Sequence, residues 1–161
     1  MAFSHDSSST QDKTAGQLQS FLQLAAQRPL QQEELIALNN LPAGLEATLG
    51  LRYTKVSFDE VRSQLRVTSA HLQPWGLVNG GVLAAVAEST GSLAGVVAAG
   101  QPVVGVNNNC DFIRGVRSGF IEAIATPIQL GRTTQVWEIN MFNEDKLVAR
   151  STLRTIVSGS R

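Results

Sequence analysis

The sequence is poor in cysteine and has no excess of positive or negative charge. Its 161 residues include one cysteine, so no disulfide can form within the chain, and the cytoplasm is the expected location. Lys and Arg number 13, as do Asp and Glu, which argues against the basic patch of a nucleic-acid-binding protein. The chain does not open with a basic segment followed by an apolar one, so we expect no secretory signal. The length predicts a single folded domain.

The sequence also lacks the residue patterns of several common catalytic and metal-binding sites. The phosphate-binding patterns GxxxxGK(S/T) and GxGxxG are absent, and no Cys/His cluster has metal-ligand spacing. With only two histidines, His5 and His71, a Ser-His-Asp triad is hard to assemble. We expect His71 to anchor a turn and Cys110 to lie in the core. Neither a metal nor a cofactor is expected.

What the sequence does contain is a long apolar stretch from His71 to Gly100. From Leu72 to Cys110 the only charged side chain is Glu88. A surface helix normally carries a charged face, so this stretch is expected to be a helix that protein surrounds nearly all round. Its length would also suit a membrane span, but Asn79 and Glu88 lie inside it and no Lys/Arg cluster flanks it, which disfavours that alternative.

The helix is predicted to have two different faces. We place its start at Asn79, a favoured N-cap residue, and advance by ~100° per residue. The arc expected to face a sheet holds Val82, Val86, Leu93 and Val97. The opposite arc holds Gly81, Ala84, Ala85, Glu88, Ser92 and Gly95. Small residues permit close approach, so Glu88 is expected at or near a dimer interface; alternatively, it is the one solvated residue of an ordinary helix.

The start of this helix is a candidate binding site for a carbonyl group. The first N–H groups of a helix lack partners within it, and glycines at Gly80 and Gly81 would let a ligand approach the backbone. A carbonyl oxygen on either N–H would be polarised as in an oxyanion hole, which is worth roughly 3–4 kcal/mol per donor. The alternative is that both glycines serve only close packing against the sheet.

The remaining sequence divides into three parts. Residues 1–15 are polar and expected to be disordered. Residues 16–44 form an N-terminal extension with two short helices, broken at Pro29, and a turn at 41–44. Residues 45–158 form the main domain, an α+β fold whose antiparallel sheet curls round the helix. Its strands are expected at 49–58, with a bulge near Lys55, and at 61–67, 101–112, 120–128, 136–142 and 147–157.

Two segments resemble a known family. The run PWGLVNGGVLAAVAESTGS at 74–92 and the segment at 103–139 are similar to hot-dog-fold acyl-CoA thioesterases of the PaaI type. The run at 74–92 especially resembles the branch typified by the Arthrobacter-type 4-hydroxybenzoyl-CoA thioesterase, and the family resemblance spans about 49–157. It implies a hot-dog fold and cofactor-free hydrolysis of an aryl or medium-chain acyl-CoA. It also implies a homodimer as the active unit, with two dimers forming a homotetramer.

The resemblance assigns catalytic roles to individual residues. Glu88 matches the family's catalytic carboxylate, which acts as nucleophile or general base, and Gly80 matches the glycine whose N–H polarises the thioester carbonyl. Gln73 and Ser92 match polar residues of the same site. Asn79 departs from the family's usual histidine and cannot carry a proton at neutral pH. A non-catalytic acyl-CoA-binding module therefore stays open as an alternative, and a hydratase as a weaker one.

The resemblance also indicates where CoA would bind. Thr133 and Thr134 fall near the family's CoA-contacting loop. Arg114 and Arg132 are candidate partners of the CoA phosphates, because Arg binds phosphate in a bidentate manner. Both arginines could equally be ordinary surface charges.

Overall fold

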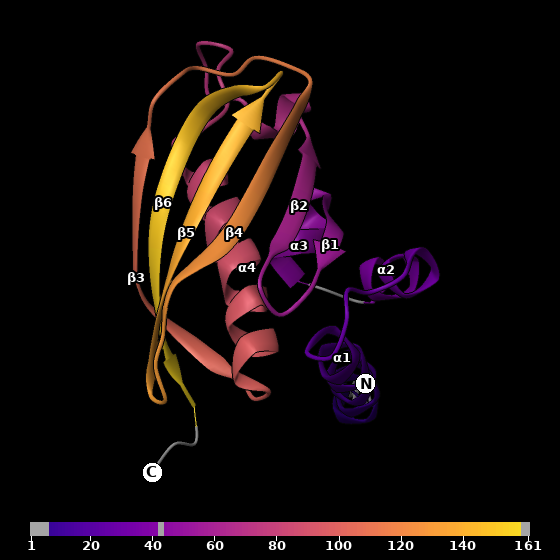
Figure 1. The fold of residues 1–161 in the computed structure, drawn as a ribbon. Helices are drawn as coiled ribbons and strands as arrows, with labels where there is room; N and C mark the ends of the chain where they lie inside the picture. The colour runs from indigo at the N-terminus through magenta and orange to yellow at the C-terminus, as the bar shows by residue number, and fades with distance from the viewer. Residues whose placement is uncertain (1–6, 42–43, 159–161) are drawn as a thin grey trace, which may run out of the picture.

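The computed structural model describes residues 7–41 and 44–158, with side chains from residue 15 onward. A six-stranded antiparallel sheet curls round one long helix, α4, and three further helices lie to one side (Figure 1). The predicted α+β arrangement is therefore confirmed. The elements are α1 (Ser7–Ala25), α2 (Gln32–Asn39), α3 (Gly44–Leu49), β1 (Leu51–Val56), β2 (Val61–Arg66), the 3₁₀ helix η1 (Ser69–His71), α4 (Gly80–Ala99), β3 (Val103–Phe112), β4 (Phe120–Leu130), β5 (Thr134–Asn143) and β6 (Lys146–Val157).

The sheet has the strand order β1-β2-β4-β5-β6-β3, so β1 and β3 form its two edges. The register of β1 against β2 shifts between Tyr53 and Lys55, which confirms the bulge predicted there. A second shift lies in the edge strand β3, between Gly105 and Asn107. The chain thus crosses from β2 to the far edge strand β3 by way of α4, which lies across the concave face of the sheet (Figure 1).

The side of α4 that faces the sheet differs from the predicted one. Val86 and Val97 are buried as expected, but Val82 and Leu93 are only half-buried. Gly95, predicted on the open face, packs against Gln135 and Val103. The buried residues of α4 are Leu83, Val86, Ala87, Thr90, Gly91, Ala94, Gly95 and Val97.

Small residues line much of this buried side because the sheet supplies the bulk of the core. Trp137, Ile139, Met141 and Leu153 of β5 and β6 are fully buried. A methyl group added at Gly91 would lie 2.6 Å from Leu153 Cδ2, so α4 approaches the sheet as closely as a glycine allows. The helix is also long and apolar enough to cross a membrane, and its contacts with β2 to β6 account for that apolarity as a core helix.

The N-terminal extension is more helical than predicted. The expectation of disorder through residue 15 is wrong from Ser7 onward, since α1 begins there, whereas residues 1–6 lie outside the described residues. The helix α3 was not predicted, and half of the predicted turn at 41–44 lies outside the described residues. Arg28 and Glu34 tie α1 to α2 by an ion pair of 2.7 Å, and the Arg28 hydrogen bond lowers the pKa of Glu34 to about 2.

Candidate active site

The N-terminus of α4 is capped as predicted. Asn79 has extended backbone angles, and its Oδ1 accepts a hydrogen bond of 2.8 Å from the Gly81 N–H. This bond satisfies one of the helix's first N–H groups. Because the Gly81 N–H is already engaged, Gly80 is the better candidate for polarising a ligand carbonyl.

A cavity of about 380 Å³ lies beside Gly80. It brings together three residues that the sequence nominated, Gln73, Gly80 and Arg114. A methyl group at position 80 would lie 2.8 Å from Phe112 Cε2, so glycine also serves close packing there. The close packing expected of Gly80 is therefore confirmed, and its role toward a carbonyl group stays a prediction. The rest of the lining is mainly apolar and consists of Leu77, Val78, Leu83, Phe112, Ile113, Gly115 and Val116.

Glu88 and Ser92 form a second group, further along α4. Both side chains are half-buried, and Ser92 Oγ donates to Glu88 Oε1 at 3.4 Å. Glu88 follows Gly80 by eight residues, which corresponds to about 12 Å along the helix axis. Neither Glu88 nor Ser92 lines the cavity beside Gly80. The structure of one chain therefore holds the predicted catalytic residues as two groups rather than one.

The residues predicted to bind CoA are also separated. Arg114 lines the cavity beside Gly80 and donates to the Leu147 carbonyl. Arg132 lines a different cavity, of about 400 Å³, near the C-terminal end of α4. Thr133 and Thr134 are exposed where β5 begins. Within one chain, the two arginines thus lie near opposite ends of the central helix.

His71 has the structural role predicted for it, whereas Cys110, predicted to lie in the core, is half-buried against it. The Thr68 N–H donates to His71 Nδ1 at 3.0 Å, which leaves the ring proton on Nε2 to donate to the Leu49 carbonyl at 3.0 Å. Cys110 packs against the core, and burial raises the pKa of its thiol, which disfavours the nucleophilic thiolate. Within the described residues, no group of three or more His, Cys, Asp or Glu side chains could hold a metal ion.

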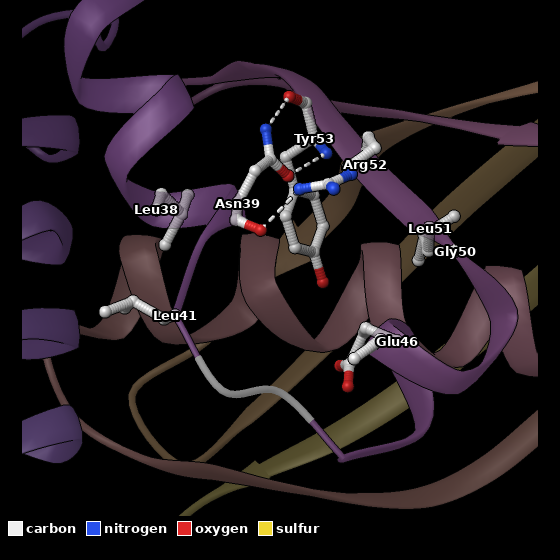
Figure 2. A pocket seen from close by; sticks show the side chains of 9 residues that line it. Leu38, Asn39, Leu41, Glu46, Gly50, Leu51, Arg52 and Tyr53 are labelled. Atoms are coloured by element: carbon white, nitrogen blue, oxygen red, sulfur yellow. Dashed lines mark hydrogen bonds between the residues drawn. The ribbon is translucent and has the colours of Figure 1, made fainter.

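Another cavity, of about 130 Å³, lies where the N-terminal extension meets β1 (Figure 2). Asn39 forms two hydrogen bonds with the backbone of Tyr53, one to its carbonyl at 2.8 Å and one from its N–H at 2.7 Å. Arg52 donates to the Asn39 carbonyl at 2.6 Å. The hydrogen bonds drawn as dashed lines in Figure 2 thus hold the extension against β1. The Tyr53 hydroxyl also donates a hydrogen bond of 3.3 Å to the Ser89 carbonyl of α4.

The sequence analysis did not single out three residues that contact α4 near Gly80 and Glu88. Phe112 covers Gly80, while Gly105 and Asn108 of β3 contact the part of α4 that carries Glu88. The run of three asparagines at 107–109 was the only unusual feature of this segment, and it carried no information about orientation. Which strand lies beside Glu88 depends on the sheet order, which the sequence does not specify.

Comparison with known proteins identifies the family. A model described as the thioesterase superfamily matches residues 76–149. A putative esterase of Mycobacterium tuberculosis is 38% identical to this chain, over 71% of this chain and 86% of its own length. This chain belongs to the thioesterase superfamily. The proofreading thioesterase EntH of Cronobacter turicensis is 37% identical, over 78% of this thioesterase and 94% of its own length.

Solved structures confirm the hot-dog fold of this thioesterase. Thioesterase HI1161 from Haemophilus influenzae matches with a TM-score of 0.73 and 36% identity, over 83% of this chain and 94% of that one. A variant of the phenylacetic acid degradation protein PaaI from Thermus thermophilus matches with a TM-score of 0.68 and 28% identity. The match covers 71% of this chain and 99% of that one. The resemblance to PaaI-like hot-dog thioesterases is thus confirmed, and the chain is a thioester hydrolase.

Proposed function

We propose that this thioesterase hydrolyses an acyl-CoA to the free acid and CoA, with Glu88 as the catalytic carboxylate. The observation that carries the proposal is a half-buried carboxylate on the open side of α4, beside Ser92, in the helix whose N-terminus presents Gly80 to an apolar cavity. The resemblance at 74–92 to the 4-hydroxybenzoyl-CoA branch makes aryl acyl-CoA the first substrate class to test. Medium-chain acyl-CoA is the second.

In the proposed reaction, the thioester carbonyl oxygen accepts a hydrogen bond from the Gly80 N–H, and Gln73 supports it from the same cavity. Each such donor stabilises the developing oxyanion by roughly 3–4 kcal/mol. Glu88 then either attacks the carbonyl carbon to form a mixed anhydride, which water cleaves, or removes a proton from the attacking water. The C–S bond breaks in both routes, and CoA leaves as the thiol once protonated.

We propose further that the complete site needs two chains. Gly80 and Glu88 lie about 12 Å apart along α4, so a second copy would bring Glu88 to the cavity of the first. The open side of α4 presents small residues, and the edge strand β3 exposes Val104 and Val106, which suits pairing with another copy. The active unit would be a homodimer in the cytoplasm, with two dimers forming a tetramer.

The need for two chains can be tested with mixed dimers. Gly80→Ala and Glu88→Gln are each expected to be inactive alone. Because a two-fold dimer has two equivalent sites, a one-to-one mixture that exchanges subunits would recover about a quarter of the wild-type rate. Absence of any recovery, with heterodimers shown to form, would contradict the shared site.

The decisive experiment for the function is a steady-state assay over a panel of aryl and aliphatic acyl-CoA thioesters, with detection of the released thiol. We expect turnover of at least one thioester by wild type and turnover slower by about 10²–10⁴-fold by Glu88→Gln. Added chelator is expected to have no effect. Retained CoA binding without turnover of any thioester would instead favour the acyl-CoA-binding module, which Asn79 favours because its side chain carries no titratable proton and already caps Gly81.

A further inference from the structure

The Glu88 carboxylate lies directly against the backbone of the edge strand β3. A Cβ built on Gly105 would overlap Glu88 Oε1 and would lie 3.2 Å from the carboxylate carbon. The carboxylate therefore fills the space that a side chain at position 105 would need. On its other side, Oε1 accepts the hydrogen bond from Ser92, which is Glu88's one hydrogen-bond partner among the described side chains.

A short chain of hydrogen bonds ties β3 to the same turn of α4. Asn108 Nδ2 donates to the Ala84 carbonyl at 2.9 Å, and Ala84 precedes Glu88 by one helical turn. The buried Ser151 of β6 donates to Asn108 Oδ1 and also to the Asn109 carbonyl at 3.1 Å. Asn108 therefore has its amide group held at both ends, so the distance between β3 and this turn of α4 is fixed.

The bulge in β3 allows Gly105 and Asn108 to act together. In a regular strand, residues three apart point to opposite faces of the sheet. The register with β6 shifts between Gly105 and Asn107, so the strand contains one extra residue at this point. As a result both Gly105 and Asn108 face α4, one beside Glu88 and the other beside Ala84.

We infer that Gly105 and Asn108 are positioning residues that fix the Glu88 carboxylate for catalysis. The inference rests on the proposed role of Glu88. Gly105 provides the space for Oε1, and Asn108 holds the helical turn that carries the side chain. Oε1 is thereby confined between Ser92 and β3, while Oε2 stays available as the oxygen that attacks the thioester or takes the proton from water.

Kinetics of Gly105→Ala test this inference. The added methyl group would displace the carboxylate, and a displacement of about 1 Å can cost ~10²-fold in rate. We expect kcat to fall by roughly 10- to 100-fold with KM unchanged, because Gly105 does not line the cavity beside Gly80. Gly16→Ala is the matched control, since it makes the same substitution in α1, where an added Cβ would meet nothing within 4 Å.

One further variant keeps the inference testable if Gly105→Ala folds poorly, and a double variant extends the test if it folds well. Asn108→Asp keeps the size of the side chain but removes the donor to Ala84, so we expect the same loss in kcat without a change in KM. Combining Gly105→Ala with Glu88→Asp shortens the carboxylate and relieves the overlap. The double variant should therefore lose less activity than the product of the two single losses.

A crystal structure of Gly105→Ala separates this inference from the proposed function. We expect the Glu88 carboxylate to move away from β3 while the backbone of α4 stays in place. A carboxylate that keeps its position, or a wild-type kcat in Gly105→Ala, would overturn the positioning role. Absence of turnover by wild type on every thioester would overturn the proposed function instead, and the crystal structure would still decide whether Gly105 positions Glu88.

Discussion

The two long sides of α4 are built from similar residues but serve opposite purposes. On the sheet side, Gly91 must be small because Leu153 and Ile139 occupy the space beside it. On the open side, small residues of the same kind surround Glu88 and remain only half-buried. Smallness by itself therefore does not indicate a subunit interface. The open side is distinguished by its carboxylate. Substitutions on the sheet side should therefore change stability, whereas substitution of Glu88 should change activity.

The largest effect should come from Glu88→Gln, which keeps the size of the side chain but removes its charge. General-base and nucleophilic roles are worth about 10²–10⁴-fold in rate, so we expect a loss of that order in kcat/KM. The thermal unfolding midpoint should stay at its wild-type value, because Glu88 makes no ion pair among the described residues. A variant that loses stability together with activity would show that Glu88 serves the fold.

The second prediction compares the introduction of valine on the two sides of the helix. In Gly91→Val, the Cβ alone would lie 2.6 Å from Leu153, and such overpacking typically costs about 1–3 kcal/mol. Urea unfolding should show this loss. Ala85→Val on the open side is the control and should leave the free energy of unfolding nearly unchanged, while any effect on dimer formation would appear in sedimentation. Equal destabilisation by both variants would contradict the distinction between the sides.

The third prediction concerns the N-cap of α4. Asn79→Ala removes the acceptor of the Gly81 N–H and should cost about 1 kcal/mol of stability, whereas Asn79→Asp keeps an acceptor oxygen and should not. Unfolding measurements on both variants test this difference. Asn79→His introduces the histidine that the family resemblance implies at this position, and its steady-state rate shows whether Asn79 limits activity. An Asn79→Ala variant as stable as wild type would contradict the capping role.

The fold was largely predictable because the local sequence patterns agreed with the elements that the structure contains. The N-cap preference of Asn79 placed the start of α4, and the bulge near Lys55 followed from a change in strand phase. The sheet-facing side of α4 was predicted only in part, because the arc with the largest apolar side chains was assigned to the sheet. The sheet already contains Trp137 and Met141, so small residues such as Gly91 fit against it better than large ones.

The candidate site was predictable as a set of residue types but not as an arrangement. The apolar surroundings identified Glu88, and the glycines identified the helix start. The contacts of Gly105 and Asn108 depend on the strand order and on one bulged residue, and neither leaves a local pattern. Arg132 lies near the C-terminal end of α4, at the opposite end of the helix from Gly80, and no local pattern in the sequence indicates that separation.

The smallest effect at neutral pH should come from Tyr53→Phe, at the boundary between the two sides. The Tyr53 hydroxyl donates to the Ser89 carbonyl of α4, and burial, followed by the charge of Glu46, raises the pKa of Tyr53 well above its usual value of about 10. Ionisation therefore favours the unfolded chain. The contribution of Tyr53 to stability is present below pH ~10 and is lost as the pH rises toward the folded-state pKa.

Because Tyr53 is the only tyrosine, its ionisation can be followed directly by tyrosinate absorbance in the folded protein and in urea. We expect the native protein to titrate at higher pH than the unfolded one, and the free energy of unfolding to fall with pH above about 10. Tyr53→Phe should remove the part of that fall that belongs to the phenol, while changing the rate at neutral pH very little. If the native and unfolded titrations coincide, Tyr53 stays in contact with water in the folded protein. That result would contradict the burial of Tyr53 between β1 and α4.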